Sequence, residues 1–259
     1  MAQTTLSRDS QRVRVTLPRS VADAIDVGER KARDQLAVAF GVDCPTDDSL
    51  PISFRFGPDI DSGPTIRAGS HYASSGQTQL SVPLFVAAAW NLFDQSVEWP
   101  DAEGVRAAAD ESVTIEATVD EWTPTQPVDP WDVAGESYDS VLGKTTSGGQ
   151  ADYEANMPIE VARALELDVD REAGRVVVST ACVGDRVVLV VQPDIGGDPS
   201  NPTSLSVYWG GPQGNQPRFS AQGVSTVLGV HEQLDDGPVD LQWVVNDEYA
   251  VVFVQEDSA

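Results

Sequence analysis

Short runs in which apolar and polar residues alternate dominate this chain. Examples are RVRVTL over residues 12–17, ISFRF over 52–56 and VTIEATV over 113–119. Alternation in β-branched runs bounded by Gly, Pro and Asp is typical of half-buried strands. The sequence therefore predicts many short strands, and further runs of this kind cover 175–179, 186–192, 204–208, 242–245 and 249–255.

Turn residues join some of these runs into hairpins. Gly184-Asp185 separates two apolar runs, and residues 246–248 separate Trp243–Val245 from the run that begins at Tyr249. Short polar connections that contain Gly, Asn or Asp between such runs predict β-hairpins. The last hairpin is apolar on both faces, which indicates a strand pair in the core.

Helical spacing is rarer. Apolar residues at helical intervals predict helices over 18–40, with Gly28 as a candidate break, over 83–97 and over 158–167, and a short helix over 101–109. The predicted fold class is mainly β with a few short helices (α+β). We expect β-sandwich, jelly-roll or barrel-like modules.

A short pattern, Pro-x-x-Val-Ala-x-Ala, occurs three times, beginning at Pro18, Pro83 and Pro158. An apolar residue precedes each Pro, and a large one follows each pattern. We expect each Pro to take the first helical turn, where its missing N–H costs nothing. The Val and the large residue should then face one core. Three copies predict repeated strand–helix–strand units, with a generic strand-to-helix junction as the alternative; the large residues are Ile25, Trp90 and Leu165.

The third copy continues as MPIEVARALELDVDREAGRVVV and then GDRVVLVVQP. This segment (152–192) and the first copy (12–27) resemble the AbrB/SpoVT-type swapped-hairpin family. In that family a strand ends in Pro, and a short helix, an acidic or Gly-Asp turn and further strands follow. The resemblance implies hairpins that interleave between two chains, and DNA contacts from basic residues of the first strand and its loop.

In this chain, Arg12, Arg14 and Arg19 fall at those positions of the first copy. The first copy lacks the Gly-Asp turn. The third copy carries Tyr153, Glu154 and Glu160 in place of the arginines, and these would repel phosphate. These departures restrict the implied DNA contacts to the first copy.

Stretches rich in Pro and Gly suggest domain boundaries. TPTQPVDPWDV covers 123–133, and SGGQ covers 147–150. We expect N-terminal β/α modules over 1–122, a linker over 123–150 and a C-terminal β-rich domain over 151–259.

Charge changes this picture most. The chain holds 41 Asp+Glu against 16 Lys+Arg, a net charge of -25, and its only lysines are Lys31 and Lys144. Such self-repulsion destabilises a compact state at low salt, whereas at molar salt the Debye length falls to about 3 Å. The composition therefore indicates a salt-adapted protein of a haloarchaeon or one of its viruses, with an ordinary acidic protein as the alternative.

The basic residues concentrate at the start of the chain. Residues 1–42 hold seven basic residues and five acids, whereas the remaining 217 residues hold nine basic and 36 acidic ones. The basic segment is either a contact for nucleic acid or an acidic partner, or a solvated face of a strand and helix.

No signature of catalysis or cofactor binding occurs in the sequence. It contains neither a phosphate-binding Gly-rich loop before a lysine nor a Gly-x-Ser-x-Gly motif, and the only histidines, His71 and His231, lie in unrelated segments. The segment from Asp59 through Asp61 to Gly63 and the one from Asp235 to Gly237 resemble parts of a calcium loop without its terminal Glu, so we expect turns. We expect no enzyme, no cofactor and no metal, and two buried thiols at Cys44 and Cys182 in preference to one bridge.

The longest apolar run, 82–90, is too short to span a bilayer, so we expect a protein of the cytoplasm or of a virion assembled there. These features favour a non-enzymatic, self-assembling structural protein, such as a capsid, tower or tail component of a virion. Its partners would be copies of itself or other structural subunits. The alternative is a DNA-binding regulator of the swapped-hairpin type that uses Arg12, Arg14 and Arg19. Candidate interface aromatics are Trp122, Trp131, Tyr208 and Trp209.

Overall fold

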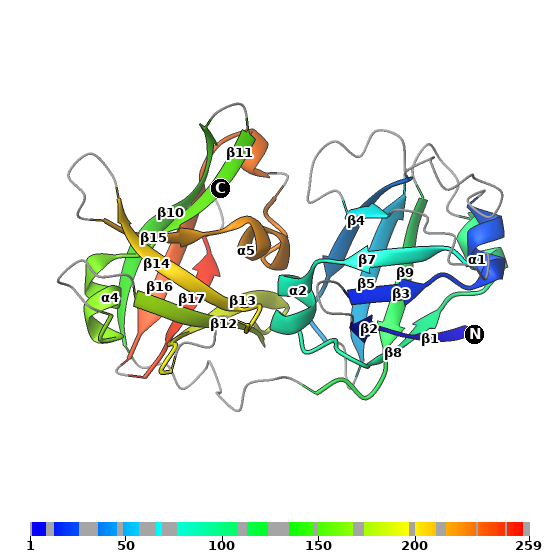
Figure 1. Cartoon of the computed structure of the whole chain (residues 1–259), viewed down its shortest axis with the longest axis horizontal. Helices are drawn as coiled ribbons and strands as arrows, with labels where there is room; N and C mark the ends of the chain where they lie inside the picture. Colours follow the sequence, from blue (N-terminus) through cyan, green and yellow to red (C-terminus); the bar gives the residue numbers. More distant parts are fainter. Residues whose placement is uncertain are drawn as a thin grey trace. The chain divides into compact units, whose positions relative to one another are not determined.

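A computed structural model gives the structure of the chain, and it divides into two compact units (Figure 1). Unit 1 comprises residues 1–87 and 91–123, and unit 2 comprises residues 88–90 and 124–259. The structure describes residues 2–8, 13–25, 36–45, 49–56, 66–68, 77–107, 113–123, 135–147, 150–167, 174–196, 200–210, 216–231, 233–246 and 248–255.

Unit 1 is built from two antiparallel sheets. The larger sheet has the strand order β1-β8-β9-β5-β4-β6, and the smaller one has the order β2-β3-β7. The strands are β1 (Ala2–Thr5), β2 (Ser7–Arg8), β3 (Val13–Thr16), β4 (Leu36–Val42), β5 (Leu50–Phe56), β6 (Ile66–Ala68), β7 (Gln79–Val82), β8 (Ser96–Trp99) and β9 (Val113–Val119). The helices are α1 (Arg19–Ala24), α2 (Leu84–Ala89), whose last residues group with unit 2, and α3 (Ala102–Ala107).

Unit 2 is a closed eight-stranded barrel with the order β10-β11-β15-β14-β12-β13-β17-β16. The strands are β10 (Glu136–Ser147), β11 (Gln150–Asn156), β12 (Gly174–Val183), β13 (Arg186–Pro193), β14 (Ser204–Gly210), β15 (Gln216–Ser220), β16 (Val239–Val245) and β17 (Ala250–Val254). Two short helices, α4 (Ile159–Ala164) and α5 (Gln222–Val227), and a 3-10 turn, η2 (Gln233–Asp235), complete this unit.

The two units share one topology. In unit 1 the strands that precede α1 and α2 pair with each other, β3 with β7, and in unit 2 the strands that precede α4 and α5 do the same, β11 with β15. Each of these four helices leads into a strand pair, namely β4–β5, β8–β9, β12–β13 or β16–β17, and α3 lies between β8 and β9. The second strands of these pairs meet, β5 with β9 and β13 with β17. Each unit is therefore a duplicated strand–helix–hairpin module, and the described part of the chain contains four such modules.

The local geometry around the helices repeats with the modules. At the start of the helix in each of these four modules, the carbonyl of the residue before the helix accepts a hydrogen bond from the N–H four residues on. These carbonyls belong to Pro18, Pro83, Pro158 and Ala221. After the helix, the backbone N–H groups of Leu92, Leu167 and Val230 each donate a hydrogen bond to the carbonyl five residues earlier in the chain. The residues just before them, Asn91, Glu166 and Gly229, have φ values of 51°, 52° and 69°, as a left-handed helix stop requires.

The predicted repeat is therefore present as three strand–Pro–helix units, and the structure adds a fourth at Ala221. Pro18 and Pro158 are the N-caps and not first helical residues, a one-residue correction. The valines Val21, Val86, Val161 and Val224 are all at most 1% exposed. Trp90 and Leu165 are buried as expected, whereas Ile25 is only half-buried.

Two predicted helices and the predicted linker need correction. The helix over 18–40 ends at Ala24, and part of its predicted length is β4, in which Val38 and Phe40 are buried by pairing. The helix over 83–97 ends at Ala89, because Asn91 turns the chain and β8 then follows. The segment 123–150, predicted to be a linker, contains β10, which is a strand of the barrel. The sequence does not predict this strand because its apolar pattern is weak.

Other predictions agree with the fold. The structure is mainly β with short helices and a closed barrel. Gly184-Asp185 turns β12 into β13, and the connection after Val245 joins β16 to β17. Cys44 and Cys182 are not joined in a disulfide, and both are half-buried where buried thiols were expected. None of the helices described is long and apolar enough to cross a membrane.

Candidate nucleic-acid interface on unit 1

The small sheet of unit 1 has one apolar face and one polar face. Val13 and Val15 on β3, and Leu80 and Val82 on β7, are buried. Because side chains alternate along a strand, Arg14 and Thr16 lie on the opposite face, beside Ser81 and Gln79 in the pairing register. These four polar side chains are partly exposed, so the face carries polar groups held on paired strands.

A hollow of about 240 Å³ lies on this sheet, and none of the described residues that line it is acidic. Arg14 pairs with Ser7 on one side and with Ser81 on the other. The guanidinium carbon of Arg8 lies 4.9 Å from the centre of the Phe93 ring, a cation–π contact that favours one orientation of the side chain. The lining residues are Thr5, Ser7, Arg8, Arg14, Thr16 and Gln79.

The structure divides the three predicted arginines. Arg14 lines the hollow, Arg19 stands on α1 in an ion pair with Asp23 (Nε–Oδ2 3.7 Å), and Arg12 lies outside the described residues. The Arg19 side chain is 94% exposed, so this pair contributes little stability. Arg8, which the strand pattern does not single out, joins Arg14 because β2 folds back on β3.

The equivalent face of unit 2 has the opposite charge. The N–H of Leu17 donates to Thr78 O and that of Met157 to Pro217 O, so these two residues correspond. Three residues earlier, unit 1 has Arg14 and unit 2 has Glu154. The two units therefore differ at the centre of this strand pair.

The Glu154 carboxylate is engaged within unit 2. It accepts hydrogen bonds from the Tyr208 hydroxyl (2.6 Å) and from Arg218 Nη1 (2.8 Å). The Tyr208 hydrogen bond and the Arg218 charge hold the pKa of Glu154 below its usual value, against the effect of burial. Burial and the hydrogen bond to Glu154 raise the pKa of Tyr208. Glu154 is therefore ionised at neutral pH and opposes anion binding on this face.

The predicted interface aromatics do not form one exposed set. Tyr208 is 38% exposed, and its hydroxyl donates a hydrogen bond to Glu154. Trp122 and Trp209 are half-buried. Trp131 lies outside the described residues. Among the three of these aromatics that the structure describes, Tyr208 is the one whose exposure suits a partner contact.

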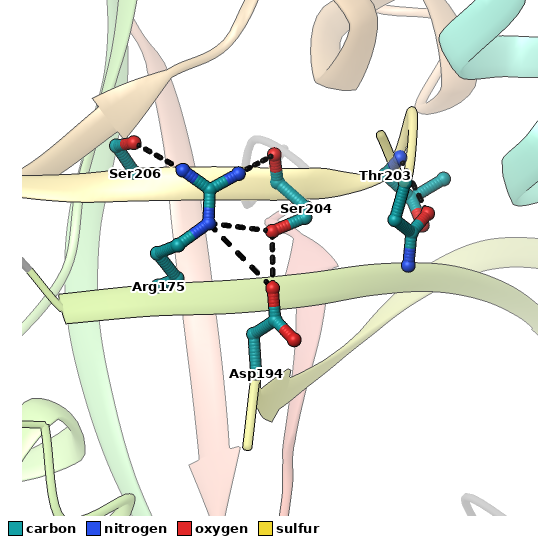
Figure 2. A network of polar contacts seen from close by, with 6 residues as sticks. Arg175, Asp194, Thr203, Ser204 and Ser206 are labelled. Atoms are coloured by element: carbon teal, nitrogen blue, oxygen red, sulfur yellow. Dashed lines mark hydrogen bonds and ion pairs between the residues drawn. The ribbon is translucent and has the colours of Figure 1, made fainter. Parts of the chain in front are cut away.

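A second polar network fastens β14 to β12 (Figure 2). Arg175 Nε donates to Ser204 Oγ (2.9 Å), and Arg175 Nη1 donates to Ser206 Oγ (3.0 Å). The Ser204 hydroxyl donates in turn to Asp194, whose carboxylate lies 3.6 Å from Arg175 Nε. These contacts fix the half-buried Arg175 side chain across the paired strands β12 and β14, so Arg175 has a structural role between these two strands.

The contacts of His231 indicate a role in holding the fold together. Its Nδ1 lies 2.9 Å from Ser225 Oγ and its Nε2 lies 3.3 Å from the Tyr153 hydroxyl. Ser225 is fully buried and His231 is 8% exposed, so a substrate cannot reach this serine in the fold as described. The contacts instead fix the segment after α5 against β11.

The candidate cation loops provide no metal centre in the described part of the chain. Asp235 lies in the turn η2 and forms an ion pair with Lys144. The other candidate, with Asp59 and Asp61, lies outside the described residues, as does His71. Among the residues described, no three His, Cys, Asp or Glu side chains gather closely enough to hold a metal ion.

Comparisons with known proteins give no relative. No family model matches the chain, and no curated protein and no solved structure matches it. The swapped-hairpin resemblance therefore stays a prediction, and in this structure the barrel of unit 2 closes with strands of a single chain.

Proposed function

We propose that this chain is the subunit of a closed protein ring that encloses duplex DNA, as DNA sliding clamps do, and that it acts by assembly. The observation that carries the proposal is the fourfold strand–helix–hairpin module, arranged as two units of one topology. DNA sliding clamps are built on a similar plan of duplicated, helix-bearing β domains, and this support is an analogy of architecture.

Repeated units favour head-to-tail association. If the contact between two copies joins unit 1 of one chain to unit 2 of the next, the resulting pair still has an uncontacted unit at each of its two ends. Such heterologous contacts produce rings when the rotation closes and filaments when it does not. The proposal thus predicts a small closed oligomer, in keeping with the expectation of self-assembly.

Sheet edges supply surfaces for that contact. In unit 1, β1 and β6 are the outer strands of the large sheet. In unit 2, the described pairings leave one side open along 136–141 of β10 and along 204–207 of β14. A strand from another copy can add to such an edge through main-chain hydrogen bonds.

The β10 edge carries features that limit indiscriminate pairing. Glu136 and Asp139 are exposed there, and charged residues on an edge oppose aggregation. Molar salt would screen these charges, so this contact fits a protein that assembles at high ionic strength. The hollow of unit 1, with Arg8 and Arg14, offers a local basic surface for the enclosed DNA in a chain of net charge -25.

Retention on DNA of different topology tests the proposal. The protein is concentrated together with a nicked circular plasmid, with the same plasmid linearised, and with the linear form blocked at both ends by biotin–streptavidin. Each mixture is then diluted in molar KCl and separated by gel filtration. We expect co-elution with the circular and the end-blocked DNA and loss from the open linear DNA, because a ring slides off free ends.

A second candidate is the DNA-binding regulator of the swapped-hairpin type. It is favoured by Arg14 and Arg19, which the structure places in one strand–helix module, on β3 and α1. A regulator would bind open and end-blocked linear DNA equally, with a preference for particular sequences. A virion component, the function first expected from the sequence, would instead form a large shell or tube without DNA.

A further inference from the structure

We propose that the hollow on the small sheet of unit 1 is a phosphate-binding site, and that the equivalent face of unit 2 does not bind phosphate. The hollow brings Arg8 and Arg14 from neighbouring strands to one place with three hydroxyl side chains and one amide. This inference does not need the ring, because a single copy carries the whole site.

The donor set fits a phosphate group. Arginine forks bind phosphate oxygens through charge-assisted hydrogen bonds, and Ser, Thr and Gln side chains also contact phosphates. Arg14 lies between Ser7 and Ser81 in the register, and Thr16 with Gln79 forms the next pair on the same face of the sheet. All these positions belong to paired strands, so binding would require little ordering of the backbone.

Arg8 lines the hollow from β2, and its orientation is set by a contact with Phe93. Its guanidinium lies over the Phe93 ring, which occupies one face of the group. A guanidinium that stacks on a ring in this way can still direct the N–H groups at its edge toward an anion. The two arginines thus approach the hollow from different strands.

The two units differ in charge at the position that Arg14 occupies in unit 1, so only unit 1 is expected to bind phosphate. Glu154 occupies the position of Arg14 in unit 2, and its carboxylate is held by Tyr208 and Arg218. The exposed Asp152 precedes it on the same strand and face. A phosphate would meet negative charge there, so the shared fold alone does not create the site.

Two sources of phosphate fit this chemistry, a nucleic-acid backbone and a free polyphosphate. Amide chemical shifts of the ¹⁵N-labelled full chain distinguish them, when recorded with sodium tripolyphosphate and separately with a short DNA duplex. The titrations are repeated at several KCl concentrations, down to the lowest at which the chain stays folded, because salt weakens phosphate contacts. We expect at least one probe to shift Ser7, Arg14, Thr16 and Gln79, and to leave residues 152–156 unmoved. Shifts with the duplex alone would identify a backbone site, and shifts with both would identify a general phosphate site.

Matched variants complete the test. Arg14→Gln and Arg8→Gln should each abolish or strongly weaken the shifts at the hollow, whereas Arg163→Gln, which removes an exposed charge from α4, should leave them intact. With the duplex, the plot of log affinity against log salt should become shallower by about 0.9 for each phosphate that the variant no longer neutralises. The proposal is overturned if neither probe moves the hollow, or if Arg14→Gln and Arg163→Gln respond alike. Ring formation is measured separately, so either proposal can fail alone.

Discussion

Truncation of Leu165 to Ala tests the repeated helix at a large buried residue of unit 2. Leu165 follows α4, is 1% exposed, and lies one turn after the buried Val161. The substitution removes three carbon atoms, a loss of about 2.4 kcal/mol at roughly 0.8 kcal/mol per buried methylene. The cavity left behind brings the expected loss in the free energy of unfolding to about 2–5 kcal/mol.

Glu166 provides the matched control one residue further on. It is exposed and has a φ of 52°, a conformation that costs an ordinary residue about 1–2 kcal/mol and glycine little. Glu166→Gly should therefore leave the free energy of unfolding unchanged or raise it by up to about 1 kcal/mol, once the entropy of the unfolded glycine is included.

Urea unfolding in molar KCl, followed by tryptophan fluorescence, measures both variants. Trp243 is fully buried in unit 2 and reports on that barrel. A loss of less than about 1 kcal/mol for Leu165→Ala would refute the assignment of this position to the core. A loss for Glu166→Gly as large as that for Leu165→Ala would refute the helix-stop geometry.

Two further predictions concern charge. The midpoint of thermal unfolding should rise steadily as KCl is raised to molar concentration, because the net charge of -25 is then screened; a midpoint that does not rise with salt contradicts the salt adaptation. The pKa of Glu154 is lowered in the fold from 4.5, so its stabilising effect is present above pH 4.5 and is lost as pH falls through the lowered pKa. Glu154→Gln should therefore flatten the acid limb of stability against pH, and Tyr208→Phe should do so in part, whereas an unchanged limb in both variants would show that this cluster contributes no pH dependence.

The repeat is predictable from the sequence because its three clear copies share a Pro that ends the strand and a Val that enters the core. The fourth copy escapes the pattern because Ala221 replaces the Pro and Ser225 replaces the Ala, although the backbone hydrogen bonds are the same. Pairing decides these positions: Ala221 donates its N–H to Tyr153 O on the neighbouring strand. The residue pattern of one strand does not show which distant strand will pair with it.

Strand pairing also explains why two helices are shorter than predicted. Residues 36–42 carry enough apolar groups to resemble a helix, yet Val38 and Phe40 are buried because β5 and β6 flank them. The barrel strand β10 resembles a linker because few of its side chains are apolar, and Leu142 alone among those described is fully buried. In both cases long-range contacts outweigh local preference.

The candidate site is predictable only in part. Arg14 can be singled out because it alternates with buried valines in a predicted strand. Arg8 cannot, because its proximity to Arg14 depends on the fold-back of β2 onto β3 and on Phe93, which lies far along the chain. The contrast with Glu154 likewise becomes visible only when the two units are aligned by their hydrogen bonds.

Molar mass in molar KCl tests the proposed ring most directly. Sedimentation equilibrium over a range of protein concentrations should show one discrete oligomer, a small whole-number multiple of the 27.7 kDa chain. Electron micrographs of the same sample should show closed particles with a central opening. A chain that stays monomeric at every concentration, or an assembly whose mass grows without limit, would contradict the ring.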